Sequence, residues 1–259
     1  MNLDQIVDLD KHPIAEGAFR DTCRDSLDGC GALVLHNFLS PEAIAAVNRE
    51  GVDKRHKAFF CEQTHNAYLG PTNPDFALNH PRNRAVVSSK GCICDDDIAE
   101  HSPLRGLYDS ADFQGFLCHV LGEQALYRYA DPLSSINLNY AEQGQELGWH
   151  FDNSSFAITL MIQSPEAGGS FDYITNLRNS SEGEMNYDGV GEVLDGNAGF
   201  ETMSLGAGDL ALFRGRDSLH RVTPVIGDTT RILVVLAYNT AADISLSESA
   251  RMSFFGRLD

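Results

Sequence analysis

The second half of the chain is built from short segments rich in β-branched, aromatic and aliphatic residues, separated by glycine, proline and aspartate. Segments of this kind are typical of strands bounded by turns. No helix is expected between them, which argues against the strand–helix–strand units of a parallel sheet and favours an antiparallel sandwich or barrel. The expected strands are residues 134–141, 155–163, 169–174, 201–205, 208–215 and 231–239.

The first half mixes both kinds of structure. Residues 31–39 are expected to form a strand, and Ser40 with Pro41 predicts the start of a helix that continues to about residue 62. Apolar residues at helical spacing predict a second helix from Ser110 to Gly122. We therefore expect an α+β fold in one domain, residues 1–259, with residues 1–130 as helical support and substrate-covering segment and 131–245 as a jelly-roll core.

Charge and composition restrict the partners. The formal net charge of −18 disfavours binding to nucleic acid and to anionic membranes, so a small-molecule substrate is expected. No apolar run approaches the about 18 residues of a membrane span, and the N-terminal residues lack the features of a secretion signal, which predicts a cytoplasmic protein with free cysteines. Cys92 and Cys94 form a C-x-C pair, but no second pair completes a metal site.

The stretch LGWHFDNSSF, residues 147–156, carries the main chemical signal. Side chains two apart on a strand share a face, so His150 and Asp152 can converge on one point. On their own they are a weak signal, because a histidine and an aspartate on a solvated strand face also occur by chance. His220 follows 68 residues after Asp152, behind another predicted strand, and would complete a set of two histidines and one carboxylate. This set is typical of non-haem Fe(II), and we expect all three residues to be metal ligands and catalytic.

Arg231 lies eleven residues beyond His220, at the start of the last predicted strand. A guanidinium offers a fixed fork of donors that matches a carboxylate. Together with the predicted iron ligands, it would suit the distal carboxylate of 2-oxoglutarate, while iron keeps positions open for the 2-oxo acid and O2. Arg231 is therefore our candidate for holding this co-substrate.

These motifs carry a resemblance to a known family. Residues 134–240 resemble the double-stranded β-helix, or cupin-like, core of Fe(II)/2-oxoglutarate-dependent oxygenases. GWHFDNSSFAITLMIQSPEAGGSFDY and HPRNRAVVSSKGCICDDDI resemble more narrowly the branch of free-amino-acid halogenases and their hydroxylase relatives. The halogenases of that branch have glycine in place of the ligand carboxylate, which leaves room for chloride. Because this chain has Asp152 there, the resemblance implies hydroxylation of a free L-amino acid.

Further residues are candidates for lining the site. Polar residues alternate with apolar ones along residues 134–141, which fits either a solvated face or a ligand-facing one. The R-x-R pair in HPRNRAVV could be two surface arginines, but the resemblance implies that one of them binds the substrate carboxylate. The neutral residues beside the iron ligands disfavour a lysine-like substrate. We expect co-substrate contacts from Arg231, Asn137 and Asn239, and substrate contacts from Arg82, Arg84, Asp131, Asn139 and Asn153.

Two other functions fit parts of the pattern. A cupin-like epimerase or binding module shares the barrel and often its histidines, but does not need an arginine like Arg231. A phytanoyl-type oxygenase would share the whole site but act on a larger or carrier-bound substrate. The long polar segment 175–200 is expected to be a functional loop or a lid over the site.

Overall fold

The structure, a computed structural model, describes residues 1–259. Its α-helices are α1 (Leu3–Ile6), α2 (Gly17–Cys30), α3 (Pro41–Lys54), α4 (Pro103–Tyr108), α5 (Ala111–Leu121), α6 (Tyr187–Leu194) and α7 (Glu248–Phe255), with 3₁₀ turns η1 (Arg55–Lys57), η2 (Asp95–Asp97) and η3 (Ser180–Glu182). The strands are β1 (Ala32–Leu35), β2 (Phe59–Asn66), β3 (Ala85–Ile93), β4 (Ile136–Ala141), β5 (Leu147–His150), β6 (Ala157–Gln163), β7 (Ala167–Gly168), β8 (Phe171–Ile174), β9 (Glu201–Met203), β10 (Leu210–Phe213), β11 (Leu219–Val222), β12 (Val225–Ile226) and β13 (Arg231–Leu236). No helix is long and apolar enough to cross a membrane.

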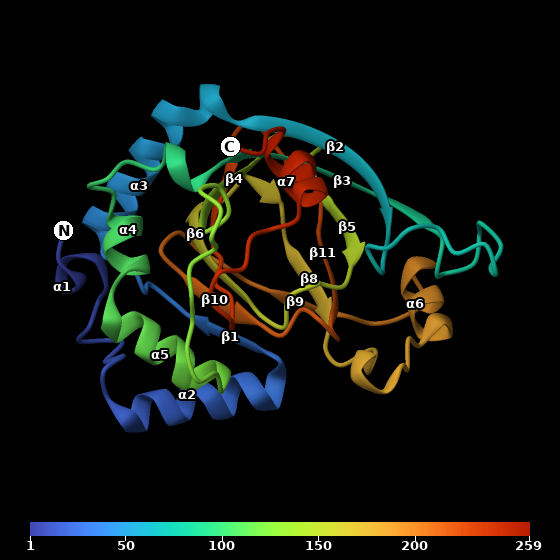
Figure 1. Ribbon diagram of the computed structural model, residues 1–259, viewed down its shortest axis with the longest axis horizontal. Helices are drawn as coiled ribbons and strands as arrows, with labels where there is room; N and C mark the ends of the chain where they lie inside the picture. The colour runs from blue at the N-terminus through green and yellow to red at the C-terminus, as the bar shows by residue number, and fades with distance from the viewer.

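Eleven strands form one curled antiparallel sheet in the order β1-β10-β6-β13-β4-β3-β5-β11-β8-β9, with β2 added to β3 (Figure 1). β3 is the connecting strand, because one part of it pairs with β4 and another with β5. The predicted antiparallel core is therefore confirmed. Strands from the first half of the chain enter the same sheet, so residues 1–130 are less purely helical than expected.

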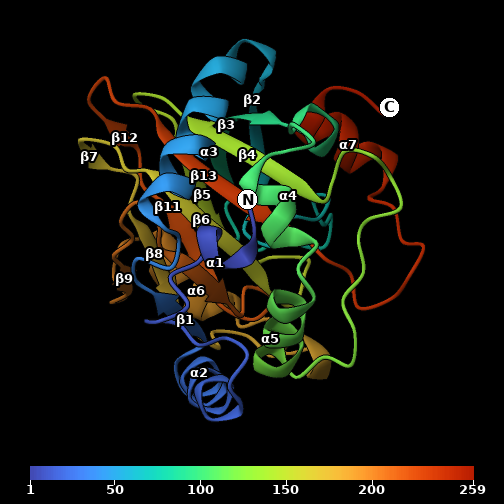
Figure 2. The same cartoon turned by 90° about the vertical axis from the view of Figure 1, so that its left-hand side faces the viewer.

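Helices α1 to α5 gather on one side of the curled sheet (Figures 1 and 2). Between them and the sheet lies a core of 35 buried residues, drawn from both halves of the chain. β4 and β13 contribute alternate residues to this core, among them Leu138, Tyr140 and Val234. The residues between these ones must point to the opposite face, into the curl of the sheet.

The strand register identifies this inner face. Asn137 pairs with Val235, Val235 with Thr159 and Thr159 with Ala211, and directly paired residues share a face of the sheet. Two residues beyond Ala211, Phe213 continues the same face, and its ring lies 5.0 Å from that of His220. The polar face of β4 therefore looks toward the region of the predicted metal ligands.

Two predicted helices are found, one of them shorter than expected. The helix from Ser40 ends at Lys54 instead of about residue 62, because the chain continues through η1 into β2, which pairs with β3 over eight residue pairs. The helix capped by Ser110 ends as predicted, at Gly122 in the left-handed conformation.

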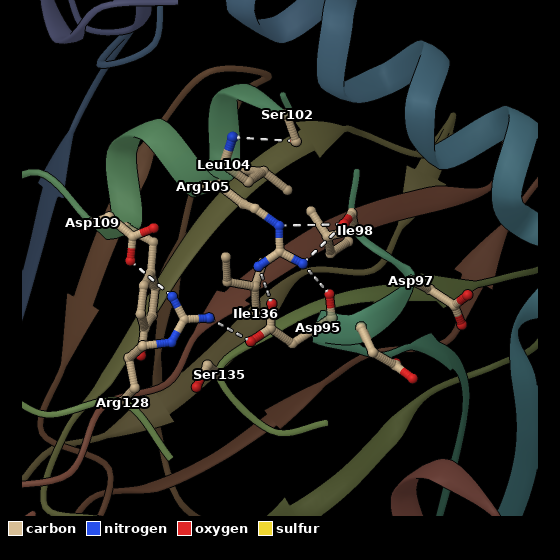
Figure 3. Close-up of polar contacts among 12 residues, drawn as sticks. Asp95, Asp97, Ile98, Ser102, Leu104, Arg105, Asp109, Arg128, Ser135 and Ile136 are labelled. Carbon is tan, nitrogen blue, oxygen red and sulfur yellow. Dashed lines mark hydrogen bonds and ion pairs between the residues drawn. The ribbon is translucent and has the colours of Figure 1, made fainter. Parts of the chain in front are cut away.

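A buried ionic cluster connects α4 to the loop before β4. Asp95, 4% exposed, accepts hydrogen bonds from Arg105 Nη1 at 2.7 Å and from Arg128 Nη2 at 2.8 Å (Figure 3). Arg128 also pairs with Asp109 at 2.8 Å. The acidic run after Cys94 is thus part of the fold, and Cys92 and Cys94 pack with apolar neighbours as free thiols.

Candidate metal centre

His150, Asp152 and His220 each offer one ligand atom, and these three atoms lie within 4.8 Å of one another. His150 and His220 are direct partners in the register of β5 and β11. Asp152 lies just beyond the end of β5, with its Oδ1 3.6 Å from His220 Nε2 and 3.8 Å from His150 Nε2. The structure therefore brings together the three ligands that the sequence predicts, as the two-nitrogen, one-carboxylate donor set suited to non-haem iron.

Backbone carbonyls orient both imidazoles. His150 Nδ1 donates to the carbonyl of Gly148 at 2.7 Å, and His220 Nδ1 donates to that of Ser218 at 3.0 Å. Because a carbonyl oxygen can only accept, the proton of each neutral ring is on Nδ1. Each Nε2 then has a free lone pair directed at the site, which is how metal-binding histidines are usually held.

The electrostatics favour the protonation states that a metal needs. Burial lowers the pKa of His150 to about 3, with His220 adding to the effect and Asp152 opposing it. Burial raises the pKa of Asp152, but the two histidines outweigh it and the net pKa is lowered. Burial lowers the pKa of His220, but the Asp152 carboxylate outweighs it and the net pKa is raised. An ionised carboxylate beside a neutral His150 is ready to bind a cation.

Three neighbours shape the surroundings of the ligands. The rings of Phe171 and Phe213 lie 5.3 and 5.0 Å from that of His220 and cover it with apolar surface. Gly215 accepts a hydrogen bond from Asp152 N at 3.0 Å, and a Cβ at Gly215 would lie only 1.9 Å from Asp152 Oδ2. The carboxylate of Asp152 therefore occupies space that only a glycine at position 215 leaves free.

Arg231 is a buried cation without a partner. It is 5% exposed, its side chain makes no hydrogen bond or ion pair, and its Nε is buried and unsatisfied. Burial lowers its pKa to about 10, so it still carries its charge at neutral pH. A buried charge of this kind is costly unless an anion compensates it, and the distal carboxylate of 2-oxoglutarate fits that need.

Asn137 and Asn139 on β4 and Asn239, just beyond β13, differ in their free groups. Asn137 donates both side-chain hydrogen bonds to the backbone, at Leu133 and Ile136, so its amide nitrogen is committed to the fold. Asn139 Nδ2 and Asn239 Nδ2 are buried without a partner. Of the three, Asn139 and Asn239 thus keep donors available for a ligand.

The two arginines expected to bind the substrate carboxylate contact protein groups. Arg84 pairs with Asp195 and donates to the Leu194 carbonyl at 2.9 Å, so it fastens the start of β3 to α6. Arg82 lies over the ring of Tyr68 at 5.6 Å, with one buried nitrogen unsatisfied. Tyr68 packs on Phe151, on the side of the chain opposite to the iron ligands. Arg84 is thus paired within the protein in this structure, and the binding of the substrate carboxylate by Arg82 or Arg84 stays a prediction.

Asp131 also has a structural environment. Its carboxylate accepts hydrogen bonds from Leu133 N at 3.1 Å, Ser134 Oγ at 2.7 Å and Leu246 N at 2.8 Å. Both oxygens hold the turn before β4 and the C-terminal segment, and the expected role of Asp131 as partner of a substrate ammonium group stays a prediction. Asn153 is exposed, and only its carbonyl is used, by Arg216 at 2.9 Å.

The segment 175–200, expected to be a loop or lid, contains η3 and α6. Val190 and Val193 on α6 are buried against Trp149 and Phe151. Since these aromatic residues alternate with His150 and Asp152, α6 packs behind the metal ligands and not over them. The length and polarity of the segment gave no sign of this short buried face.

Three residues near the ligands were not expected from the sequence. The ring of His65 on β2 lies 5.9 Å from that of His150, and His65 Nε2 is 2.6 Å from Ser88 Oγ on β3. Two residues further along β3, the ammonium of Lys90 donates to Asn139 Oδ1 at 2.7 Å. Ser88, Lys90 and Cys92 are spaced two residues apart, and this spacing could have indicated a strand with one face toward the site.

Comparison with known proteins supplies a family and a fold. A family model described as Halogenase D matches residues 75–253, a range that includes all three metal ligands and Arg231. No curated protein matches the sequence. The solved structures that resemble this one share little sequence with it, so they bear on the fold alone.

Three of these structures illustrate the likeness. A 2OG-Fe(II) oxygenase family protein from Burkholderia pseudomallei has a TM-score of 0.53 and 12% identity, over 87% of this chain and 93% of that chain. A Pseudomonas putida prolyl-4-hydroxylase has a TM-score of 0.51 and 12% identity, over 83% and 96%. The α-ketoglutarate-dependent epimerase SnoN from nogalamycin biosynthesis has a TM-score of 0.60 and 12% identity, over 86% and 84%. They confirm the predicted double-stranded β-helix fold.

Proposed function

The chain belongs to the Halogenase D family, and because it keeps the carboxylate of Asp152 between two ligand histidines, we propose that it hydroxylates an aliphatic C–H bond of a free amino acid. The predicted resemblance to Fe(II)/2-oxoglutarate-dependent oxygenases is confirmed, and the chain is a 2-oxoglutarate-dependent oxygenase that uses Fe(II). In the proposed reaction one atom of O2 enters the substrate as hydroxyl and the other enters succinate, with release of CO2.

The observation that carries this proposal is the position of the Asp152 carboxylate. Iron held by Asp152 and the two histidines would supply the oxidising chemistry at the C–H bond. The protein would contribute a fixed donor set, since the carbonyls of Gly148 and Ser218 hold both rings in place. A carboxylate ligand fills the position that the resemblance assigns to chloride in halogenases, which favours hydroxylation over chlorination.

Arg231 would bind and orient the co-substrate. Its guanidinium has no protein partner. Arg231 is the first residue of β13, which β4 and β3 separate from the ligand strand β5 in the curled sheet. A charge-assisted, bidentate contact to the distal carboxylate would fix the co-substrate by its far end. The apolar rings of Phe171 and Phe213 would limit the access of water to His220.

The proposed substrate class is a neutral L-amino acid. Leu147 and Asn153 flank the ligand pair, and neither would attract a cationic side chain. The amino-acid part of the proposal comes from the family resemblance, whose halogenases and hydroxylases act on free amino acids. A carrier-bound or larger substrate is the competing possibility.

Two measurements test the proposed function. Anaerobic addition of Fe(II) and 2-oxoglutarate should produce a weak metal-to-ligand charge-transfer band in the visible, which a cupin-like binding module would lack. A screen of free L-amino acids should then find one that stimulates succinate formation and gains a single oxygen atom, detected by mass spectrometry. A chlorinated product would refute hydroxylation, and better turnover of a methyl ester or carrier-bound aminoacyl group would refute the free-amino-acid substrate.

A further inference from the structure

We propose that Lys90 and Asn139 form a carboxylate-binding subsite on the inner face of the sheet, beside the metal ligands. The proposal rests on the proposed function, because that reaction brings carboxylates into the site on both 2-oxoglutarate and the amino acid. The juxtaposition that carries it is a lysine ammonium and a buried, unsatisfied amide on neighbouring strands of this face.

Lys90 differs from Lys54 and Lys57 in its partner. Lys54 pairs with Glu50 at 3.1 Å and Lys57 with Asp97 at 2.7 Å, as expected for a chain with a large excess of acids. Lys90 has no acidic partner and donates a single hydrogen bond, to the neutral amide oxygen of Asn139. An ammonium group has three donors, so Lys90 can bind an anion without losing this contact.

Asn139 adds a second hydrogen-bond donor to the subsite, its side-chain amide nitrogen. Its Oδ1 is occupied by Lys90, while its Nδ2 is buried and has no hydrogen-bond partner. Leaving a buried amide donor unpaired is costly, so such a group is expected to meet a ligand. The free groups of the pair are therefore all donors, and the pair carries one positive charge, which together favour an anion.

The strand register places the pair near the reaction. Lys90 shares its face of β3 with Ser88, whose hydroxyl lies 2.6 Å from His65, the neighbour of His150. The subsite thus faces the metal ligands.

Asn139 connects the subsite to the co-substrate anchor. It pairs with Leu233, two residue pairs along the β4–β13 ladder from the pair of Ala141 with Arg231. Lys90 on β3 and Arg231 on β13 therefore lie on the two strands that flank β4, the strand of Asn139. Two unpaired cations here suit ligands that bring more than one carboxylate.

The C-terminal helix covers the ammonium with apolar surface. Lys90 Nζ lies 5.3 Å from the centre of the Phe254 ring, and Phe255 packs against Cys92 in the same face of β3. An aromatic ring beside an ammonium excludes water from one side of it and so strengthens its attraction for a carboxylate. The helix α7 thereby becomes part of the subsite.

The experiment measures binding by calorimetry on the Mn(II)-loaded, full-length protein without O2. 2-Oxoglutarate is titrated first, and the neutral L-amino acids are then titrated one by one into the Mn(II)–2-oxoglutarate complex. Lys90→Met should weaken binding of one of these ligands about tenfold or more, because a charge-assisted hydrogen bond is lost. Lys90→Arg should retain most of the affinity, and exposed Lys11→Met is the matched control that should bind like the wild type.

The two sources of carboxylate give different results. If Lys90→Met weakens 2-oxoglutarate, the subsite holds the co-substrate. If it weakens only the amino acid, and the methyl ester of that amino acid binds wild type and variant equally, the subsite holds the substrate carboxylate. Asn139→Asp keeps the shape of the side chain but gives Lys90 an acidic partner, so it should weaken the same ligand as Lys90→Met does.

The failure of each proposal has its own signature. Wild-type affinity of Lys90→Met for both ligands, or of Asn139→Asp if Lys90→Met does not fold, would overturn the subsite. A wild-type protein that binds 2-oxoglutarate but no amino acid would refute the proposed substrate class, and the co-substrate titration would still decide the role of Lys90. A wild-type protein that binds neither ligand would refute both proposals.

Discussion

Replacing Arg231 by methionine should stabilise the protein without ligand and abolish most of its response to 2-oxoglutarate. Burial lowers the pKa of Arg231 from 12.5 to about 10, which corresponds to about 3 kcal/mol of unfavourable charge burial. This cost is fully present below about pH 10, where the side chain is charged whether the protein is folded or not. Methionine removes the charge but packs less completely, so we expect a gain of about 1–3 kcal/mol in the free energy of unfolding.

The same substitution removes the anchor for the co-substrate. Loss of a charge-assisted contact of about 1.5–3 kcal/mol should raise the Kd of 2-oxoglutarate about ten- to a hundredfold. At a concentration of about 100 times the wild-type Kd, the ligand should stabilise the wild type by about 2.7 kcal/mol but the variant by only about 0.4–1.4 kcal/mol. The two effects therefore have opposite signs, which a general loss of folding would not produce.

Thermal unfolding of the Mn(II)-loaded protein, with and without 2-oxoglutarate, measures both effects. At about 2–4 °C per kcal/mol, the variant should melt a few degrees higher than the wild type without ligand and shift much less on adding it. Arg24→Met, which removes a charge from the surface of α2, is the control and should change neither value. A destabilised Arg231→Met protein with an unchanged ligand response would show that Arg231 is structural.

Three other predictions concern the metal ligands and the ionic cluster. His150→Ala and His220→Ala should each lose most of the bound Fe(II), measured by metal analysis after desalting, and full retention would refute the ligand assignment. Asp152→Gly should lose hydroxylation with at most slight chlorination, seen by mass spectrometry, and unchanged hydroxylation would contradict its role. Asp95→Ala should lower the free energy of unfolding by about 3–5 kcal/mol, because two arginines lose their buried partner; Asp109→Ala, at the exposed end of the cluster, should cost about 1 kcal/mol or less.

The part of the fold that could be predicted is the part with local signals. Strands β4, β6, β10 and β13 are apolar runs bounded by turn residues, and the helix from Ser110 to Gly122 has both of its ends encoded in the sequence. Strands β2 and β3 were missed because polar residues interrupt them and their pairing partners are distant. Helix α6 was missed because only a few residues, Val190 and Val193 among them, bury its apolar face.

The candidate site also has a part that local sequence signals predict and a part that depends on distant segments of the chain. The convergence of His150 and Asp152 follows from strand periodicity, and the ring of His220 joins them because β11 is paired with β5. The contacts of Arg84 with Asp195 and of Asp131 with the backbone of Leu246 could not be predicted, because both partners are more than a hundred residues away in the chain. Periodicity can say which face a residue shares, but not whether another segment has already satisfied its charge.

The relation between Asp152 and Gly215 shows how local the difference between hydroxylation and chlorination can be. Asp152 is positioned through its backbone, by the hydrogen bond to the Gly215 carbonyl, and both histidines are oriented by carbonyls of their own strands. Removing the carboxylate should therefore leave the two rings in place and vacate the space beside Gly215. That space would be open to an anion, but the glycine next to it has no side chain to donate a hydrogen bond. A halide could then enter this space without a hydrogen bond to hold it. The loss of hydroxylation should therefore not bring a comparable gain of chlorination.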